Sequence, residues 1–291
     1  MKHIDNRIVD KLIAFQKNEI TEHAIYLKLA AKIKDSHNSS VLKSIGDDEL
    51  RHYLLFKKYT GRDVGPRRWR VFKFFWISRI FGLTFGIKLM EKGEDSAQEN
   101  YAALTSVVDE LSDIIKEEQD HEQKLIGLIR EERLKYIGSI VLGLNDALVE
   151  LTGTLAGLSF ALRDTRIIAL AGLITGIAAS LSMAASEYLS TKTEEEGENA
   201  LKSSIYTGIA YIITVAVLIA PYLLFDNYLV CLAITLSAAV LIIGLFNYYI
   251  SVARDLSFKK RFLEMTAISM GVAAISFGIG YAVRLVLGVD I

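Results

Sequence analysis

Three stretches of this chain are too long and too apolar for the surface of a water-soluble protein. Residues 167–186, 203–225 and 227–253 contain no Asp, Glu, Lys or Arg. A helix needs about 20 apolar residues to cross the hydrocarbon of a bilayer, and each stretch reaches that length. Two further apolar segments flank them. The sequence therefore predicts five membrane-spanning helices, at about 136–162, 167–189, 204–224, 228–252 and 262–287.

Charge is distributed unevenly along the 291 residues. Of all residues 52% are hydrophobic and 23% are charged, yet most charges precede residue 135 and all five histidines precede residue 122. We therefore expect an all-α protein with two domains, residues 1–134 in the cytoplasm and residues 135–291 in the membrane. The lone cysteine, Cys231, excludes a disulfide framework and a cysteine-based metal site. No feature indicates nucleic-acid binding.

The polar domain contains one pattern twice. A glutamate is followed seven residues later by a tyrosine, and then by Glu-x-x-His. Residues three apart share a helix face, so each Glu-x-x-His presents two ligands in one direction. A four-helix bundle that supplies two such pairs and two further glutamates holds two iron or manganese ions. The predicted ligands are Glu19, Glu49, His52, Glu94, Glu118 and His121.

The spacing of these ligands suits two helical hairpins. We expect helices at 5–33 and 40–59, joined by a polar turn near 34–39, because residue 34 is the midpoint between Glu19 and Glu49. A second pair is expected at 84–103 and 107–133. Tyr26 and Tyr101 either donate hydrogen bonds to ligand carboxylates or serve as ordinary core residues.

The segment 66–83, between the two hairpins, is basic and strongly aromatic. Two interpretations are compatible with this composition. The segment is either an interfacial membrane anchor, with Trp69 and Trp76 at headgroup depth, or the crossover that any such bundle needs, packed on the bundle side.

Ionisable groups inside the predicted spans indicate an ion or proton path, because a charge in hydrocarbon is costly. Asp146 and Glu150 lie one turn apart in the first span, and Met183 and Glu187 lie one turn apart in the second. Carboxylates with a thioether favour a soft divalent ion such as Fe²⁺ over Mg²⁺ or Ca²⁺. Asp146 has no purely structural explanation about a third of the way into its span. Met183 alone is either a metal ligand or an ordinary packing or lipid-facing residue, and Glu187 lies either on the path or simply at the cytoplasmic interface. Asn145, Glu150 and Glu187 add ligands or carry counter-protons.

The loops predict the orientation of the chain. Residues 253–261 contain four basic side chains, whereas the 225–227 loop and the C-terminus contain none. The positive-inside rule then places the N-terminus in the cytoplasm and the C-terminus outside the cell membrane. The small residues of the first two spans allow close helix packing, either within the chain or in a dimer. They include Gly153, Gly157, Gly172 and Gly176.

These motifs resemble two known families joined end to end. Residues 1–134 resemble ferritin-like, rubrerythrin-type di-iron bundles, through the two Glu-x6-Tyr and Glu-x-x-His sets. Residues 135–291 resemble the vacuolar iron transporter family, through Val-Leu-Gly-Leu-Asn-Asp-Ala-Leu-Val at 141–149 and Ser-Leu-Ser-Met-Ala-Ala-Ser-Glu-Tyr-Leu-Ser at 180–190. This resemblance implies a five-span, dimeric transporter in which Asp146 and Met183 are pore metal positions.

Two departures from these families affect the expected function. The loop at 191–203 is too short for the long metal-collecting insertion of vacuolar transporters, so the N-terminal bundle takes that role. A rubredoxin segment is also missing, which leaves no dedicated electron supply for peroxidase activity.

The sequence therefore predicts an exporter of Fe²⁺ or Mn²⁺ that exchanges metal for protons, with a cytoplasmic bundle that captures, senses or oxidises the metal. The alternative is a membrane-anchored ferroxidase or peroxidase of the rubrerythrin type. A metal sensor whose membrane half signals is a third hypothesis.

Overall fold

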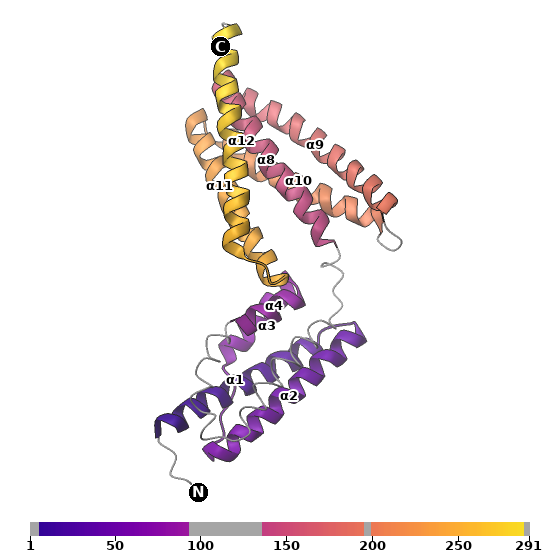
Figure 1. The fold of residues 1–291 in the computed structure, drawn as a ribbon, viewed down its shortest axis with the longest axis vertical. Helices are drawn as coiled ribbons and strands as arrows, with labels where there is room; N and C mark the ends of the chain where they lie inside the picture. The colour runs from indigo at the N-terminus through magenta and orange to yellow at the C-terminus, as the bar shows by residue number, and fades with distance from the viewer. Residues whose placement is uncertain (1–5, 93–135, 195–198, 288–291) are drawn as a thin grey trace. The chain divides into compact units, whose positions relative to one another are not determined.

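The computed structural model describes residues 6–92, 136–194 and 199–287, and its regular elements within these ranges are all α-helices (Figure 1). This confirms the all-α class for the described part of the chain. The molecule divides into two compact units, residues 1–131 and residues 132–291.

The first unit begins with an antiparallel hairpin of α1 (Asn6–Ala30) and α2 (Ser36–Thr60). The connecting turn starts slightly earlier than predicted. Asp35 caps α2, because its carboxylate accepts a hydrogen bond from the Asn38 backbone N–H across 2.7 Å. Gly61, with φ of 63°, ends α2 in the left-handed conformation that glycine adopts without strain.

Two contacts set the register of this hairpin. The Ser39 hydroxyl donates to the Ala30 carbonyl across 3.1 Å, and His23 Nδ1 lies 2.6 Å from the Gly46 carbonyl oxygen. A Cβ on Gly46 would lie 3.3 Å from Cβ of the buried Tyr26, so the absence of a side chain lets α1 and α2 approach closely. The register places α1 and α2 residues whose numbers sum to about 69 opposite each other.

The aromatic segment forms α3 (Arg68–Phe81), and Gly82, with φ of 107°, separates it from α4 (Leu83–Lys92). Helix α4 begins where the third bundle helix was predicted. The remainder of that predicted helix and the fourth one, 107–133, lie outside the described residues. The core of this unit joins α1 to α4 and includes Leu29, Leu42, Phe75, Ile87 and Met90.

The second unit contains five helices that are long and apolar enough to cross a membrane. Each overlaps one of the predicted spans; the first starts one residue later than predicted, and the other four extend one to five residues beyond the prediction at one end or both. The helices are α8 (Ile137–Leu162), α9 (Thr165–Glu194), α10 (Ala200–Leu224), α11 (Tyr228–Ala253) and α12 (Phe258–Leu287).

Short polar residues start three of these helices. The Asp164 side chain accepts hydrogen bonds from two backbone N–H groups in the first turn of α9. The Asn199 side chain accepts one from the Lys202 backbone N–H of α10. The Asn227 side chain accepts hydrogen bonds from two backbone N–H groups in the first turn of α11. Such caps satisfy N–H groups that have no partner within the helix. They also mark the residues at which these helices begin.

Glycines allow α8 to lie against its neighbours at the centre of this unit. A Cβ on Gly143 would fall 2.4 Å from the Thr207 carbonyl oxygen of α10, and one on Gly280 of α12 would fall 2.2 Å from the Gly157 carbonyl oxygen. Gly153, Gly172 and Gly176 likewise face side chains of other helices in the same unit. The small residues therefore serve contacts within the chain.

Candidate metal sites

The first candidate site lies between α1 and α2. Glu19, Glu49 and His52 each offer a ligand atom, and these atoms all lie within 4.8 Å of one another. Their exposed fractions are only 4%, 3% and 5%. His52 Nδ1 lies 3.6 Å from Glu19 Oε2. The hairpin register brings Glu19 opposite Glu49, and the three-residue spacing brings His52 onto the same face.

The electrostatics of this cluster suit a divalent cation. Two carboxylates at this separation repel each other by about 3.5 kcal/mol at an effective dielectric constant of about 20. Burial adds a desolvation cost to each ionised group. A bound cation removes the repulsion and replaces the lost hydration, and carboxylate with imidazole ligands suits Fe²⁺ and Mn²⁺. The buried Glu22, one turn from Glu19, is a further carboxylate nearby.

A hydrogen-bonded segment covers the α1 face beside Glu19. Thr60 Oγ1 donates to Gln16 Oε1 across 2.8 Å, and Gln16 Nε2 donates to the Arg62 carbonyl across 2.9 Å. The Arg67 backbone N–H donates to Thr21 Oγ1 across 2.9 Å. Gln16 and Thr21 are fully buried, so these bonds fix the connection between α2 and α3 against the site.

Asp63 anchors the same connection from the solvent side. Its carboxylate accepts hydrogen bonds from Lys57 Nζ across 2.7 Å and from the Tyr53 hydroxyl. The hydrogen bond from Lys57, followed by that from Tyr53, lowers the pKa of Asp63 below its ordinary value. The same bond from Lys57 raises the pKa of the lysine.

The described residues supply half of the predicted di-metal site. Glu94, Glu118 and His121 lie outside them, so the structure brings together Glu19, Glu49 and His52 only. The resemblance implies two ions, and the donor set of Glu19, Glu49 and His52 fits one of them.

The second candidate site follows one face of α8. Ser139, Gly143, Asp146 and Glu150 succeed one another at intervals of four, three and four residues, which places them within a sector of about 60° around the helix axis. On α9, Gly176, Ser180, Met183 and Glu187 form a similar row.

Glu187 joins three helices at one end of these rows. Its Oε1 atom accepts hydrogen bonds from Ser139 of α8 across 2.7 Å and from Ser203 of α10 across 2.6 Å. The two serine hydroxyls lie 2.5 Å apart. Thr207, one turn further along α10, donates to the Ser139 carbonyl across 3.0 Å. A carboxylate is thus held inside the helix assembly by hydroxyl groups of its neighbours.

Glu150 ends the polar row of α8. Its Oε2 atom accepts a hydrogen bond from the hydroxyl of Tyr211, a fully buried residue of α10, across 2.7 Å. From the level of Ser139 to that of Glu150, the row spans about 16 Å at 1.5 Å per residue, roughly half the thickness of a bilayer's hydrocarbon. Asp146 lies between these two ends and is half-buried.

Two contacts fix the antiparallel register of α8 and α9. Ser139 pairs with Glu187, and a Cβ on Gly172 would meet Leu155 Cδ2 at 3.0 Å. This register puts Asp146 level with residue 180 of α9 and Met183 level with residue 143 of α8. The levels of Asp146 and Met183 therefore differ by three residues, or about 4.5 Å along the helix axes. Met183 packs against the core of the unit, as does Leu144. Asp146 and Met183 therefore occupy neighbouring levels of adjoining helices.

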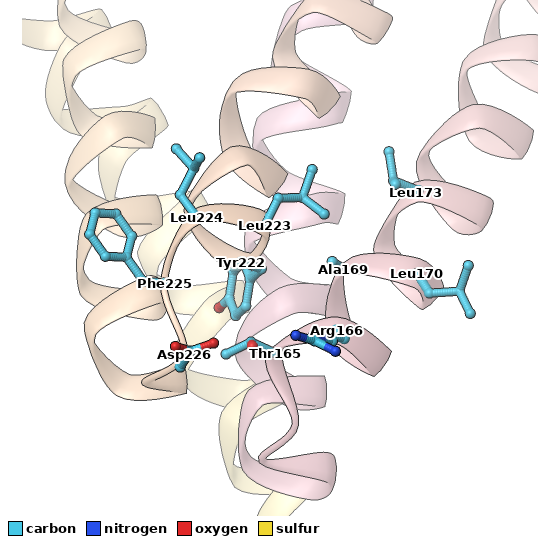
Figure 2. A pocket seen from close by; sticks show the side chains of 10 residues that line it. All are labelled: Thr165, Arg166, Ala169, Leu170, Leu173, Tyr222, Leu223, Leu224, Phe225 and Asp226. Atoms are coloured by element: carbon cyan, nitrogen blue, oxygen red, sulfur yellow. The ribbon is translucent and has the colours of Figure 1, made fainter.

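A pocket in the same unit lies elsewhere. It is formed by the first turns of α9 and the last turn of α10, and Figure 2 shows Thr165, Arg166 and Asp226 along one edge with Leu173, Leu223 and Leu224 toward the other. Of the described candidate residues, none lines this pocket. The polar rows of α8 and α9, not this pocket, contain the chemistry suited to a metal ion.

Ser139, Ser203 and Tyr211 were not predicted as site residues. A signal for Ser139 exists in the sequence, because it precedes Asp146 by seven residues and so shares its helix face. Ser203 and Tyr211 lie on another helix, and their pairing depends on a helix register that local spacing does not give.

Comparison with known protein families bears on this second site. Residues 137–204 match the model of the VIT family. The matched segment contains α8, α9 and the start of α10, and hence Asp146, Glu150, Met183 and Glu187. No curated protein matches the chain. The match and the five apolar helices support a multi-pass membrane domain of VIT type, and the VIT family suggests a membrane metal-ion transporter.

Proposed function

We propose that the protein exports Fe²⁺ or Mn²⁺ from the cytoplasm in exchange for protons. The observation that carries this proposal is the polar row of α8, in which Asp146 lies between the Glu187–Ser139–Ser203 cluster and the Glu150–Tyr211 pair. Such groups are costly in hydrocarbon, and their alignment in adjoining helices supports an ion path.

The path begins at Glu187, near the short loop between α9 and α10. The metal ion passes from there to Met183 and Asp146, which lie at neighbouring levels, and leaves beyond Glu150. Carboxylate oxygens and the thioether replace part of the ion's water shell. Metal and protons compete for the same carboxylates, so loading of the metal releases protons and its departure rebinds them, which supports exchange.

The N-terminal unit captures the ion before transport. Glu19, Glu49 and His52 would hold one ion, and Glu94, Glu118 and His121 are the proposed ligands of a second in a ferritin-like bundle comprising residues 1–134. The support for this role is the burial and closeness of the first three groups. When bound, two iron ions would also supply redox chemistry.

We further propose that the transporter is a homodimer with its N-terminus in the cytoplasm and its C-terminus outside. Glu150 is exposed in the single chain although it belongs to a candidate span, and a second copy covering this face would remove a carboxylate from contact with lipid. The basic residues of the 253–261 loop support the orientation.

Fe²⁺ flux in proteoliposomes tests the proposal. We expect Asp146→Ala to abolish flux and His52→Ala to leave flux measurable but to weaken capture. Glu264→Gln, which changes an exposed carboxylate of α12, is the matched control and should transport normally. Folded protein that oxidises Fe²⁺ but carries none across the membrane would favour the ferroxidase alternative.

A further inference from the structure

Helix α3 has two unlike faces. Phe74, Phe75 and Ser78 are buried on one side, where Lys28 Nζ of α1 lies 4.5 Å from the centre of the Phe75 ring. The opposite side exposes Trp69 to 72% and Phe72 and Trp76 to about half, at 49% and 48%. The sequence alone left a packed crossover and a membrane anchor as alternatives. The buried face accounts for the packing and leaves the exposed aromatic face unexplained.

The exposed rings form one continuous stripe. Trp69 and Phe72 stack with ring centres 5.7 Å apart, and Phe72 meets Trp76 edge to face at 6.3 Å. Their positions, three and four residues apart, lie within about 60° around the helix axis. A contiguous aromatic surface, in contrast to scattered exposed apolar residues, marks an interaction site.

The charged residues of α3 itself are all positive. Helix α3 has four basic residues and no acidic residue. Arg68, Lys73 and Arg79 are exposed and flank the stripe, at helix angles of about 40° to 100° from Trp69. Arg70 differs, because its Nη1 donates to Asn18 Oδ1 of α1 across 3.3 Å. Lys73 Nζ also lies 5.2 Å from the centre of the Phe74 ring of the same helix. The exposed cations of α3 thus flank its aromatic stripe and match a negatively charged partner.

We propose that the aromatic stripe of α3 docks on an anionic lipid surface, with Trp69, Phe72 and Trp76 in the headgroup layer and Arg68, Lys73 and Arg79 on lipid phosphates. Tryptophan favours this layer because its ring is apolar and its N–H is polar. The five apolar helices of the same chain keep a bilayer at high effective concentration near the first unit. Docking of this kind does not require transport activity.

The native fluorescence of the full-length protein tests the docking. The chain has two tryptophans, Trp69 and Trp76, so all tryptophan emission reports on α3. The probe is protein reconstituted in vesicles of phosphatidylcholine and phosphatidylglycerol, with and without lipids brominated near the headgroup. We expect brominated lipid to quench the emission and aqueous iodide to have little effect. Quenching by iodide alone, or by neither agent, would overturn the proposal, since the stripe would then face water or protein.

Charge reversal distinguishes docking through the basic residues of α3 from tryptophans that merely lie near the bilayer. Each basic residue near an anionic surface contributes about 1 kcal/mol, so R68E/K73E/R79E should lower the docking equilibrium by at least about 100-fold. The tryptophan emission of this variant should become sensitive to iodide. The matched control K11E/K43E/K58E makes the same charge change at exposed lysines of α1 and α2 and should keep its quenching by brominated lipid. If both variants lost quenching by brominated lipid equally, or if R68E/K73E/R79E lost none, Arg68, Lys73 and Arg79 would not be the residues that bind the lipid phosphates.

Discussion

The Ser139 hydroxyl of α8 donates a hydrogen bond to the Glu187 carboxylate of α9 across 2.7 Å. This bond, together with that from Ser203, fixes the carboxylate at the junction of three helices. The position matters because Glu187 begins the proposed path toward Met183 and Asp146.

Removing the serine donors should weaken both stability and transport. A hydrogen bond to a charged group contributes about 1.5–3 kcal/mol, so Ser139→Ala and Ser203→Ala should each lower the free energy of unfolding by roughly that amount. Metal flux should fall because Glu187 loses its fixed orientation. Ser237→Ala is the matched control, since its exposed hydroxyl donates to the Ala233 carbonyl of its own helix. Unfolding in detergent and flux in vesicles measure the two effects.

Gly143 should tolerate no side chain. A Cβ there would fall 2.4 Å from a backbone oxygen of α10, at Thr207. Overpacking of this kind typically costs about 1–3 kcal/mol, so Gly143→Ala should lower the midpoint of thermal unfolding. Gly271→Ala serves as the control, because a Cβ there meets no described atom within 4 Å. An unchanged midpoint for Gly143→Ala would show that α8 and α10 are not packed so closely.

The cluster of Glu19, Glu49 and His52 should bind Mn²⁺ through all three side chains. His52→Ala removes a direct ligand, so we expect a loss of affinity beyond the roughly 10–100-fold typical of outer-sphere partners. Titration of the full-length protein with Mn²⁺, followed by electron paramagnetic resonance, measures the affinity. Asp47→Asn alters an exposed carboxylate near Glu49 and should bind as the wild type does. Equal affinity of His52→Ala and wild type would exclude this site.

Asp63 should make the thermal stability of the first unit depend on pH in the acid range. Its folded pKa is lowered by the hydrogen bonds from Lys57 and Tyr53, so the stabilisation is present above its ordinary pKa of 3.8 and is lost as pH falls through the lowered value. Asp63→Asn should therefore unfold at a lower temperature than wild type at neutral pH. The difference should shrink below about pH 4.

Tryptophan fluorescence during heating follows the unfolding of α3, which directly follows the Asp63 connection. Asp10→Asn, an exposed change on α1, is the control and should match wild type across the pH range. A difference between Asp63→Asn and wild type that stays as large well below pH 3.8 as at neutral pH would contradict the assignment to the ionised carboxylate.

Much of the helix pattern follows directly from sequence. The charge-free stretches locate α9 to α11, and residues such as Asp164 and Asn227 mark helix starts because their side chains cap free N–H groups. The Glu19 and Glu49 positions likewise agree with the observed hairpin, since their midpoint lies beside its turn. These features are local or depend on a single turn, so they can be predicted from a single sequence.

The partners of the membrane carboxylates could not be predicted in the same way. Tyr211 lies 61 residues from Glu150, and Ser203 is 64 residues from Ser139, so the pairing depends on how α8 and α10 pack. Gly143 permits that packing, but a single glycine in an apolar helix does not reveal which neighbour approaches it.

Proton flux driven by metal is the most direct measurement of the central claim. Vesicles containing the full-length protein and an internal pH indicator would receive Fe²⁺ or Mn²⁺ while metal uptake is recorded in parallel. Under the proposed exchange, protons and metal move in opposite directions, Asp146→Asn stops both fluxes and Glu264→Gln stops neither. Metal transport that continues unchanged in Asp146→Asn would contradict it.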